Sequence, residues 1–477
     1  MSVKNQHADY ARMESVWKRC EDVACGQDAV HAAGEVYLPK LKDQTPEDYK
    51  AYLLRATFYN AGWRTIAGLI GMLFRKPPVV EVPAGIEDYL DDVTMSGIPL
   101  HVFVQEIAEE CLIAGRCGLL VDYPQANVTG ATVADAQSLG LRPTMQLYEA
   151  LSIINWRVTR VNNQSVLSLV VLTESAVTLK DEFTEEAEIH YRVLDLFNGQ
   201  YRQRVFRVEH DKDILLEEFT PLMNGKPLDY IPFVFFGSDD LTPEVDEPPL
   251  IDLINTNLAH YRTTADYEHG CHFTGLPTAV VSGYTPITDG EKLYIGSQAA
   301  WVFPDPGAKA SFLEFTGQGL QSLEKNLESK EQQMAVLGAR MLEALKRGVE
   351  SAQTASIHRV GEESVLAAIA QVISMGVTKA LGWFAEWANA DGEVKFELNR
   401  DFYPAPMDYN MLTSLIAGWQ QGAYSYDTLF DNLKAGEVVG VDATAEEEQA
   451  KIANAPPLLN SPALAPTGLP AGTSATA

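Results

Sequence analysis

The sequence QGLQSLEKNLESKEQQMAVLGARMLEALK, at residues 318–346, sets the architecture expected of this chain. Its apolar residues recur at steps of three and four, which is the spacing of one helix face; they are Leu320, Leu323, Leu327, Met334, Leu337, Met341 and Leu345. At 1.5 Å per residue the predicted helix is ~43 Å long. Few helices in globular proteins are that long. The segments on either side of it therefore indicate which architecture contains this helix.

Upstream, a second predicted helix precedes a compact insert of short strands. Residues 248–273 place Leu250, Leu258 and Ala265 on one stripe, behind two prolines that suit a first helical turn. The insert, residues 274–317, contains the strand-like segments TAVVSGY, AAWVFP and ASFLEF, separated by prolines and glycines. We therefore expect two long helices joined by a small β unit.

Downstream, the polar segment 347–355 interrupts the pattern before a still longer helical run at residues 356–390. Gly361, Gly376 and Gly382 lie within this run and would let it bend. Residues 391–442 contain the strand-like VKFELNRDF and a small helical unit at 409–433. The Pro/Ala/Thr-rich tail, residues 443–477, is expected to be disordered.

The N-terminal part, residues 1–247, is predicted to begin with helices and to continue as a β-rich region. Thr45 and Pro46 are predicted to start one helix that continues to Arg75. A second helix at 99–114 leads into a buried strand at 118–124. From about residue 144 to 238 the period is two, as in LSLVVL, AEIHYRVLDL and QYRQRVFRVEH. The expected fold class is α+β, mainly α.

The 477-residue chain is strongly acidic, with 36 Lys and Arg against 65 Asp and Glu and a formal net charge of -29. This balance argues against a protein that binds nucleic acid by neutralising phosphates over a broad basic surface. The 5 cysteines are sparse, which favours reduced thiols in an intracellular protein. No signal peptide is visible, and the most lipid-like stretch, residues 66–74, is too short to span a membrane. We expect no membrane partner.

The motifs of common enzymes are absent from the sequence, so no catalytic, cofactor or metal site is predicted. There is no phosphate loop ending in Gly-Lys-Ser/Thr, no HExxH, no G-x-S-x-G and no pair of CxxC motifs. His260, His269, Cys271 and His272 form the one cluster with ligand chemistry. A polar helix end explains that cluster better than zinc, because no second ligand pair accompanies it.

The order of the predicted elements resembles that of the portal proteins of tailed bacteriophages. The segments YLPKLKDQTPEDYKAYLLRATFYNAGWRTIAGLIGMLFRKPP (37–78) and FVQEIAEECLIAGRCGLLVDYP (103–124) also look like those of one phage portal family. The resemblance covers roughly residues 37–440. It implies the following parts: a wing or body at 1–247, stem helices at 248–273 and 318–346, a β-containing clip at 274–317, a tunnel loop at 347–355, a long kinked wing helix at 356–390 and a crown region at 391–442.

The resemblance implies a structural protein of the virion rather than an enzyme. Portals form rings at a capsid vertex, usually of twelve subunits in mature heads, and duplex DNA passes along the axis during packaging and ejection. The implied partners are further copies of the chain, the terminase large subunit, a head–tail adaptor, capsid and scaffolding proteins, and double-stranded DNA bound without sequence specificity. ATP hydrolysis would belong to the separate terminase motor.

Two sets of candidate site residues follow from this resemblance. In the tunnel loop, Lys346 and Arg347 would contact phosphates briefly, Glu350 would shorten the contact, and Ser351, Gln353 and Thr354 would hydrogen-bond phosphates without reading sequence. In the clip, the aromatic candidates for interfaces are Tyr284, Tyr294, Trp301 and Phe303. The alternatives are an ordinary helix–helix turn for the loop and a small local core for the clip.

Two other functions remain open from the sequence. One is a metal- or carboxylate-dependent hydrolase, whose only candidate ligands are the histidines and cysteine of residues 260–272. The other is a different head–tail structural protein, such as an adaptor, although adaptors are usually much shorter.

Overall fold

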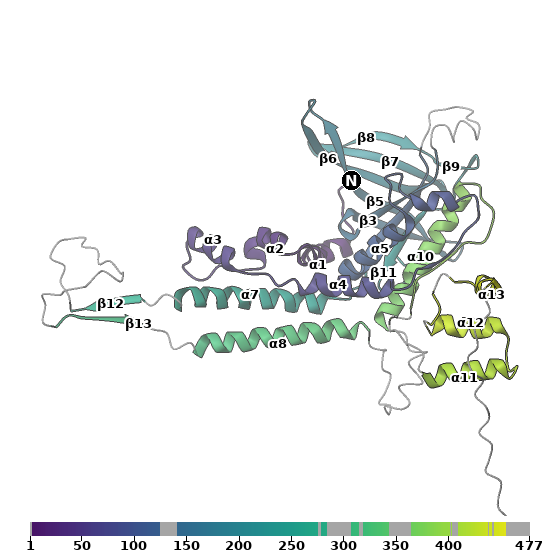
Figure 1. Cartoon of the computed structure of the whole chain (residues 1–477). Helices are drawn as coiled ribbons and strands as arrows, with labels where there is room; N and C mark the ends of the chain where they lie inside the picture. The colour runs from purple at the N-terminus through teal and green to yellow at the C-terminus, as the bar shows by residue number, and fades with distance from the viewer. Residues whose placement is uncertain are drawn as a thin grey trace, which may run out of the picture. The chain divides into compact units, whose positions relative to one another are not determined.

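A computed structural model shows the chain as two compact units, Met1–Arg400 and Asp401–Ala477. The structure describes residues 2–124, 141–274, 278–283, 307–313, 318–342, 364–400, 402, 409–436, 438–440 and 443–454. Helices and antiparallel sheets are both present in the first unit, whereas the described elements of the second unit are helices (Figure 1).

The chain begins with a group of short helices: α1 (Ala8–Cys25), α2 (Gln27–Ala33), the 3-10 turn η1 (Gly34–Val36), α3 (Pro46–Arg55) and α4 (Ala61–Leu73). Thr45 caps α3 as predicted, since its hydroxyl accepts a hydrogen bond from the Asp48 backbone N–H (3.1 Å). The prediction of one continuous helix to Arg75 was wrong, because the chain leaves the helical conformation between α3 and α4.

Asn60 explains this break. Ala56 has an extended backbone (φ -66°, ψ 114°), and the Asn60 side chain accepts from the Trp63 N–H (2.9 Å), which starts a new helix. Tyr59 and Trp63 fitted the helical spacing, yet they are 40% and 38% exposed. The periodic pattern therefore ran across two separate helices.

A three-stranded antiparallel sheet forms the centre of the first unit. Its order is β11-β2-β3, from β2 (Arg116–Asp122), β3 (Thr144–Glu149) and β11 (Phe233–Gly237). Helix α5 (Leu100–Ala114) packs on β2 and ends at Gly115, whose left-handed φ of 66° closes the helix. Helix and strand agree with the sequence-based expectation, and β2 begins two residues before the predicted Gly118.

Helix α10 (Val365–Trp387) packs against the same sheet. A Cβ at Gly376 would lie 2.3 Å from the Phe236 ring, so this glycine allows α10 to approach β11 closely. The contact accounts for Gly376 without the bend that the sequence suggested. Among the described residues, α10 is also the one helix long and apolar enough, by length and composition, to cross a membrane. Residues 66–74 are therefore not the most lipid-like stretch, and 56% of the apolar window in α10 is buried in protein.

A second antiparallel sheet has five strands in the order β4-β5-β6-β7-β8. They are β4 (Ile153–Val161), β5 (Gln164–Leu179), β6 (Glu185–Phe197), β7 (Gln200–Glu209) and β8 (Lys212–Phe219). Smaller elements are β1 (Val79–Glu81) paired with β14 (Lys395–Glu397), β9 (Leu222–Met223) paired with β10 (Lys226–Pro227), and the 3-10 turns η2 (Glu87–Asp91) and η3 (Ala150–Ser152). The period of two thus identified the β-rich region correctly.

Arg116 fixes the connection from the sheets to the next helix. Its guanidinium carbon lies 4.2 Å from the Trp156 ring centre and 4.5 Å from that of Phe235. Nη1 donates hydrogen bonds to the carbonyls of Pro243 (3.0 Å) and Glu244 (2.9 Å) in the linker. Burial lowers the pKa of Arg116 to about 10, so the group remains charged at neutral pH.

After this linker come α7 (Ile251–Thr274), β12 (Thr278–Ser282), β13 (Lys309–Leu313) and α8 (Gln318–Arg340). The helix predicted to reach Lys346 ends at Arg340, and a turn follows at Met341 and Leu342. Helix α10 starts at Val365 and is capped by Ser364, whose hydroxyl accepts a hydrogen bond from the Ala367 N–H (3.2 Å). Within the described residues, α8 and α10 have 23 residues each. The prediction that the helix after residue 355 is longer than the helix before it was therefore wrong for this part of the chain.

The second unit contains α11 (Tyr409–Gln420), α12 (Tyr426–Ala435) and α13 (Ala445–Asn454). The first two agree with the predicted helical unit. Helix α13 corrects the prediction of a tail disordered from residue 443. Thr444 caps this helix by accepting from the Glu447 N–H (3.3 Å), and three acids occupy its first turn, where they favour the helix dipole.

Three carboxylates lie near one another where α1, α5 and β3 meet. Burial, with the charge of Glu149 as the next cause, raises the pKa of Glu110 to about 8 and that of Glu21 to about 7. Glu110 Oε2 and Glu21 Oε1 are buried and have no hydrogen-bond partner among the described residues. Both carboxyls are therefore more easily protonated than an exposed glutamate.

We expect Glu110→Gln to stabilise the protein at high pH. A carboxyl whose folded pKa lies above its unfolded value contributes stability at low pH and loses that contribution as the pH rises through about 8. Thermal unfolding at pH 5 and pH 9 should show the variant more stable by about 1–3 kcal/mol at pH 9 and nearly equal at pH 5. The exposed Glu87→Gln is the control, and equal losses in variant and parent would contradict the assignment.

Candidate functional site: the paired helices α7 and α8

Helices α7 and α8 lie side by side, and the ribbon β12–β13 stands between them in the sequence (Figure 1). The ribbon is antiparallel, with Thr278 opposite Leu313 and Ser282 opposite Lys309. The helices have 24 and 23 residues, or ~35 Å each at 1.5 Å per residue. Two long helices joined through a small β unit were expected from the sequence, and the described elements have this order.

Small residues allow the helices to pack closely. A Cβ on Gly270 would lie 2.7 Å from Leu320 Cδ2, so α8 approaches α7 near its start. Further along, Met334 is buried with Leu253 of α7 and Ala61 of α4, and Leu337 packs beside them. Helix α8 is therefore held by α7 along its length and by α4 near its end.

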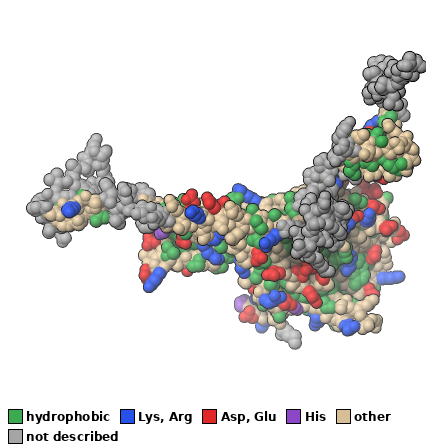
Figure 2. All heavy atoms as spheres, turned by 90° about the horizontal axis from the view of Figure 1, so that it is seen from below, with side chains coloured by type: hydrophobic (Ala, Val, Ile, Leu, Met, Phe, Trp, Pro, Cys, Tyr) green, Lys and Arg blue, Asp and Glu red, His purple; other side chains and the backbone are tan. Residues whose placement is uncertain are grey.

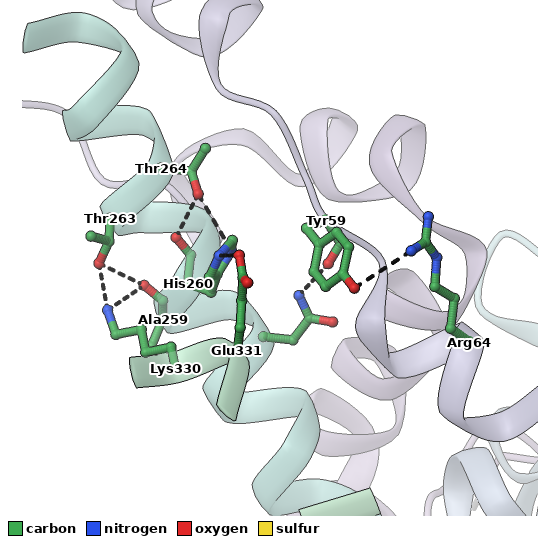
Figure 3. A network of polar contacts seen from close by, with 9 residues as sticks. Tyr59, Arg64, Ala259, His260, Thr263, Thr264, Lys330 and Glu331 are labelled. Carbon is green, nitrogen blue, oxygen red and sulfur yellow. Dashed lines mark hydrogen bonds and ion pairs between the residues drawn. The ribbon is translucent and has the colours of Figure 1, made fainter. Parts of the chain in front are cut away.

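A polar network crosses the same contact (Figure 3). Lys330 Nζ donates to the carbonyl of Ala259 (2.9 Å) and to the hydroxyl of Thr263. His260 Nε2 lies 3.4 Å from Glu331 Oε1, an ion-pair distance without hydrogen-bond geometry. Burial lowers the pKa of both His260 and Lys330. A lowered pKa favours the neutral His260 ring, which forms no ion pair with Glu331. The hydrogen bonds of Lys330 are therefore the stronger polar link between α7 and α8.

On its other side α7 is fastened to the N-terminal helices. Asn257 Oδ1 accepts from the Gly62 N–H (2.9 Å), and Asn257 Nδ2 donates to the Tyr59 carbonyl (2.8 Å). Tyr52 donates its hydroxyl proton to Asp266 (2.7 Å). Asn257 was missed by the sequence analysis, although a polar residue on the apolar stripe of a helix was a visible signal.

The histidines and cysteine considered as ligands do not converge. His260 faces Glu331, whereas the His269 ring contacts Tyr52 (5.2 Å between centroids) and His272 lies 3.2 Å from Arg55. Cys271 is a free, partly exposed thiol. In the part of the chain that the structure describes, no three His, Cys, Asp or Glu side chains are placed to share a metal ion. These histidines and this cysteine therefore do not form the ligand cluster that the hydrolase alternative requires.

The two predicted sets of site residues lie outside the described residues. These are Lys346, Arg347, Glu350, Ser351, Gln353 and Thr354 of the tunnel loop and Tyr284, Tyr294, Trp301 and Phe303 of the clip. The ends of the loop segment are nonetheless defined, because the Leu366 N–H donates to the Met341 carbonyl (3.1 Å). The chain therefore leaves α8 and enters α10 at one point of the first unit.

The face of α8 turned away from α7 is exposed and polar. Its exposed residues include Gln321, Glu324, Lys325, Glu328, Gln332, Val336 and Arg340. A shallow groove of about 450 Å³ runs along it, lined partly by Ser329, Gln333 and Leu337. Figure 2 shows basic and acidic side chains interspersed over the described part of the face that it views, without a broad basic patch.

We expect Lys330→Ala to loosen α8 from α7, because the substitution removes two hydrogen bonds from a charged donor. Amide hydrogen exchange across α8 should rise about tenfold, equivalent to ~1.4 kcal/mol, while exchange in the central sheet stays unchanged. Lys325→Ala, on the exposed face of the same helix, is the matched control. An unchanged exchange rate in α8 would show that apolar packing alone holds the pair.

The family description "Domain of unknown function (DUF4055)" matches residues 249–388, which include α7, the ribbon, α8 and α10. No curated protein matches the sequence. The chain is similar to a chain in the neck of an empty gene transfer agent (GTA) particle computed with C6 symmetry, at 10% identity and a TM-score of 0.37, covering 86% of this chain and 94% of that chain.

Two further structures give similar values. For the virion of a native GTA particle the identity is 9% and the TM-score 0.38, covering 90% of this chain and 99% of that chain. For the neck of a native GTA particle computed with C12 symmetry, the identity is 10% and the TM-score 0.39, and the match covers 84% of this chain and 98% of that chain.

Proposed function

We propose that this chain is a portal subunit, one copy of a ring at a vertex of a tailed-phage head through which DNA enters and leaves. The observation that carries the proposal is the sequence of parts in the first unit: a sheet-containing body, α7, the ribbon β12–β13, α8, and a segment that starts and ends beside Met341 and Leu366. In a portal these parts would be the wing, the two stem helices, the clip and the tunnel loop.

The burial of α8 supports assembly into a ring. One side of the helix is buried against α7 and α4, and the opposite side is open, including Val336 at 53% exposure. Identical subunits that meet through two different surfaces close into a ring when the rotation between them allows it. In this arrangement, the open side of α8 would face a neighbouring stem.

The charge supports a conduit rather than a DNA-binding protein that stays in place. The net charge is -29. Many of the described cations of the five-stranded sheet are also already paired with acids, such as Arg192 with Glu174 (2.6 Å) and Arg202 with Asp195 (2.9 Å). Few cations of that sheet are left to neutralise phosphates, so passing DNA would not be held.

The proposed partners follow from the same arrangement. The clip, with Tyr284, Tyr294, Trp301 and Phe303, would meet the terminase large subunit during packaging and the adaptor afterwards, and the body would contact capsid and scaffolding proteins. The loop with Lys346 and Arg347 would touch DNA without reading its sequence. A different head–tail structural protein is the second candidate, since its subunits would also assemble but would not need the loop.

The purified protein should assemble into closed rings. Native mass spectrometry at micromolar concentration should give one dominant species of about twelve 52.4 kDa chains, and electron micrographs should show a central opening. A monomer or dimer that persists from low to high micromolar concentration would contradict the portal proposal.

Deleting residues 348–353 should separate the loop's role from that of a structural turn. Because the ends of the segment are joined by the Leu366 to Met341 hydrogen bond, the shortened loop can still close and rings should form. Packaged DNA length or retention should fall severalfold in particles that carry the variant. A matched variant with six Gly/Ser residues in this place keeps the length and tests the side chains. Normal packaging by both variants would rule out the channel role.

A further inference from the structure

Strands β5 and β6 continue beyond the rest of their sheet as a two-stranded arm, residues 173–189 (Figure 1). Strand β4 pairs with β5 only as far as Leu172, and β7 pairs with β6 only from His190 onward. Between these limits, β5 and β6 pair only with each other. A ribbon of two strands is marginally stable in water unless something packs on it.

One face of this arm is apolar and uncovered. Val177 lies opposite Ala187, and Ser175 opposite Ile189, so these side chains share a face with Leu179. Val177 is 58% exposed, Ile189 60% and Leu179 76%. At the tip of the arm, Phe183 is 90% exposed. Such a face is unfavourable in water and is typical of a contact surface.

The apolar face is bordered by carboxylates. Asp181 and Glu182 lie beside Phe183 at the tip, and Glu185 lies opposite Leu179. On the other face of the ribbon, Glu186 lies 3.7 Å from Lys180 and Glu188 lies 3.6 Å from Arg207, so these two acids already have basic partners. A surface that fits the arm must therefore be apolar at its centre and positively charged where it meets the tip.

The same chain carries a groove with these properties, formed by α1, the η1 turn and α7. Its volume is about 460 Å³, its apolar lining includes Val36 and Leu258, and its cations are Lys18, Arg19 and Arg262. None of the residues that line it is acidic.

Two of the three cations in the groove donate hydrogen bonds to neutral groups and not to carboxylates. Arg19 donates to the neutral side chain of Asn255 (2.7 Å), and Arg262 donates to the backbone carbonyl of Tyr37 (2.9 Å). Lys18 is the exception, with Asp22 at 2.6 Å. The groove therefore attracts an acidic partner.

A second groove, at the base of the arm, differs in this respect. There Arg207 lies 3.6 Å from Glu188 and 2.7 Å from Glu209, and Lys4 lies 4.0 Å from Asp211. Its cations already have acidic partners within the chain, so it has little charge to offer an acidic arm.

We infer that the arm of one copy of this chain seats in the α1/η1/α7 groove of a neighbouring copy. Phe183 and Leu179 contact the exposed Val36, above the nearly buried Leu258, and the carboxylates of the tip face Arg19 and Arg262. Arm and groove lie on different elements, so the contact is head-to-tail and can propagate around a ring. The inference rests on the proposed ring assembly and identifies one of its contacts.

Cysteine cross-linking tests the contact directly. Cys25 and Cys271 are first replaced by serine, because both are accessible thiols. Phe183→Cys and Val36→Cys are then combined in one chain, and mild oxidation should produce a ladder of covalent oligomers longer than dimers on a non-reducing gel. Each single cysteine variant should give at most dimers. A cross-link confined to single chains, or none in assembled rings, would overturn the inference.

Charge reversal provides the second test. Phe183 is 90% exposed, so Phe183→Ser should leave thermal unfolding unchanged. Arg19 is partly exposed, and Arg19→Glu removes its hydrogen bond to Asn255, so this variant should fold with slightly lower stability. Each should raise the concentration needed for ring assembly about tenfold, and Glu182→Arg should partly restore assembly of the Arg19→Glu variant. Arg160→Glu, at an exposed position of β4 outside both the arm and the groove, is the control. Normal assembly of both Arg19→Glu and Phe183→Ser would overturn only the arm contact and leave the proposed function standing. Absence of rings from the unaltered chain would overturn the proposed function.

Discussion

The buried guanidinium of Arg116 is the contact on which the placement of α7 depends. It lies against both the Trp156 and the Phe235 ring and donates to two successive carbonyls of the linker that leads into α7. Its Nε and Nη2 atoms have no hydrogen-bond partner among the described residues, so aromatic faces rather than acceptors surround much of the cation. A lysine would not replace it, because a point charge cannot stack on two rings and bind two carbonyls at once.

Beyond this point, the two sides of α7 are held by different means. Towards the N-terminal helices, Asn257 and Asp266 form short, directed hydrogen bonds with backbone and side-chain groups. Towards α8, apolar packing around Met334 is supplemented mainly by Lys330. Directed bonds to the body fix the rotation of α7 about its axis, and this in turn decides which side of α8 stays open.

Local patterns in the sequence predicted the elements well but could not predict contacts between distant segments. The helical spacing around Leu327 and the alternation around Val193 correspond to α8 and β6. The break before Asn60 was not predicted, because Asn257, almost two hundred residues away, stabilises it. The burial of Arg116 was not predicted either, because the two rings that contact it belong to two other strands. In the candidate site, the paired helices and the β ribbon were predicted from the sequence. The ligand cluster at His260 and His269 would have required these side chains to converge, and on α7 they do not.

Charge places opposite demands on a conduit and on its assembly. Copies with a net charge of -29 repel one another at long range, although salt at physiological strength screens that repulsion beyond about 8 Å. Attraction between copies must therefore come from short-range contacts. In the contact that we infer, an apolar arm edged with carboxylates would meet a groove whose arginines bind neutral acceptors, and the overall acidity would stay intact. In the proposed ring, an acidic surface that repels DNA would then be compatible with cohesion between subunits, because Arg19 and Arg262 bind neutral acceptors within the chain and could pair with the carboxylates of a neighbouring arm.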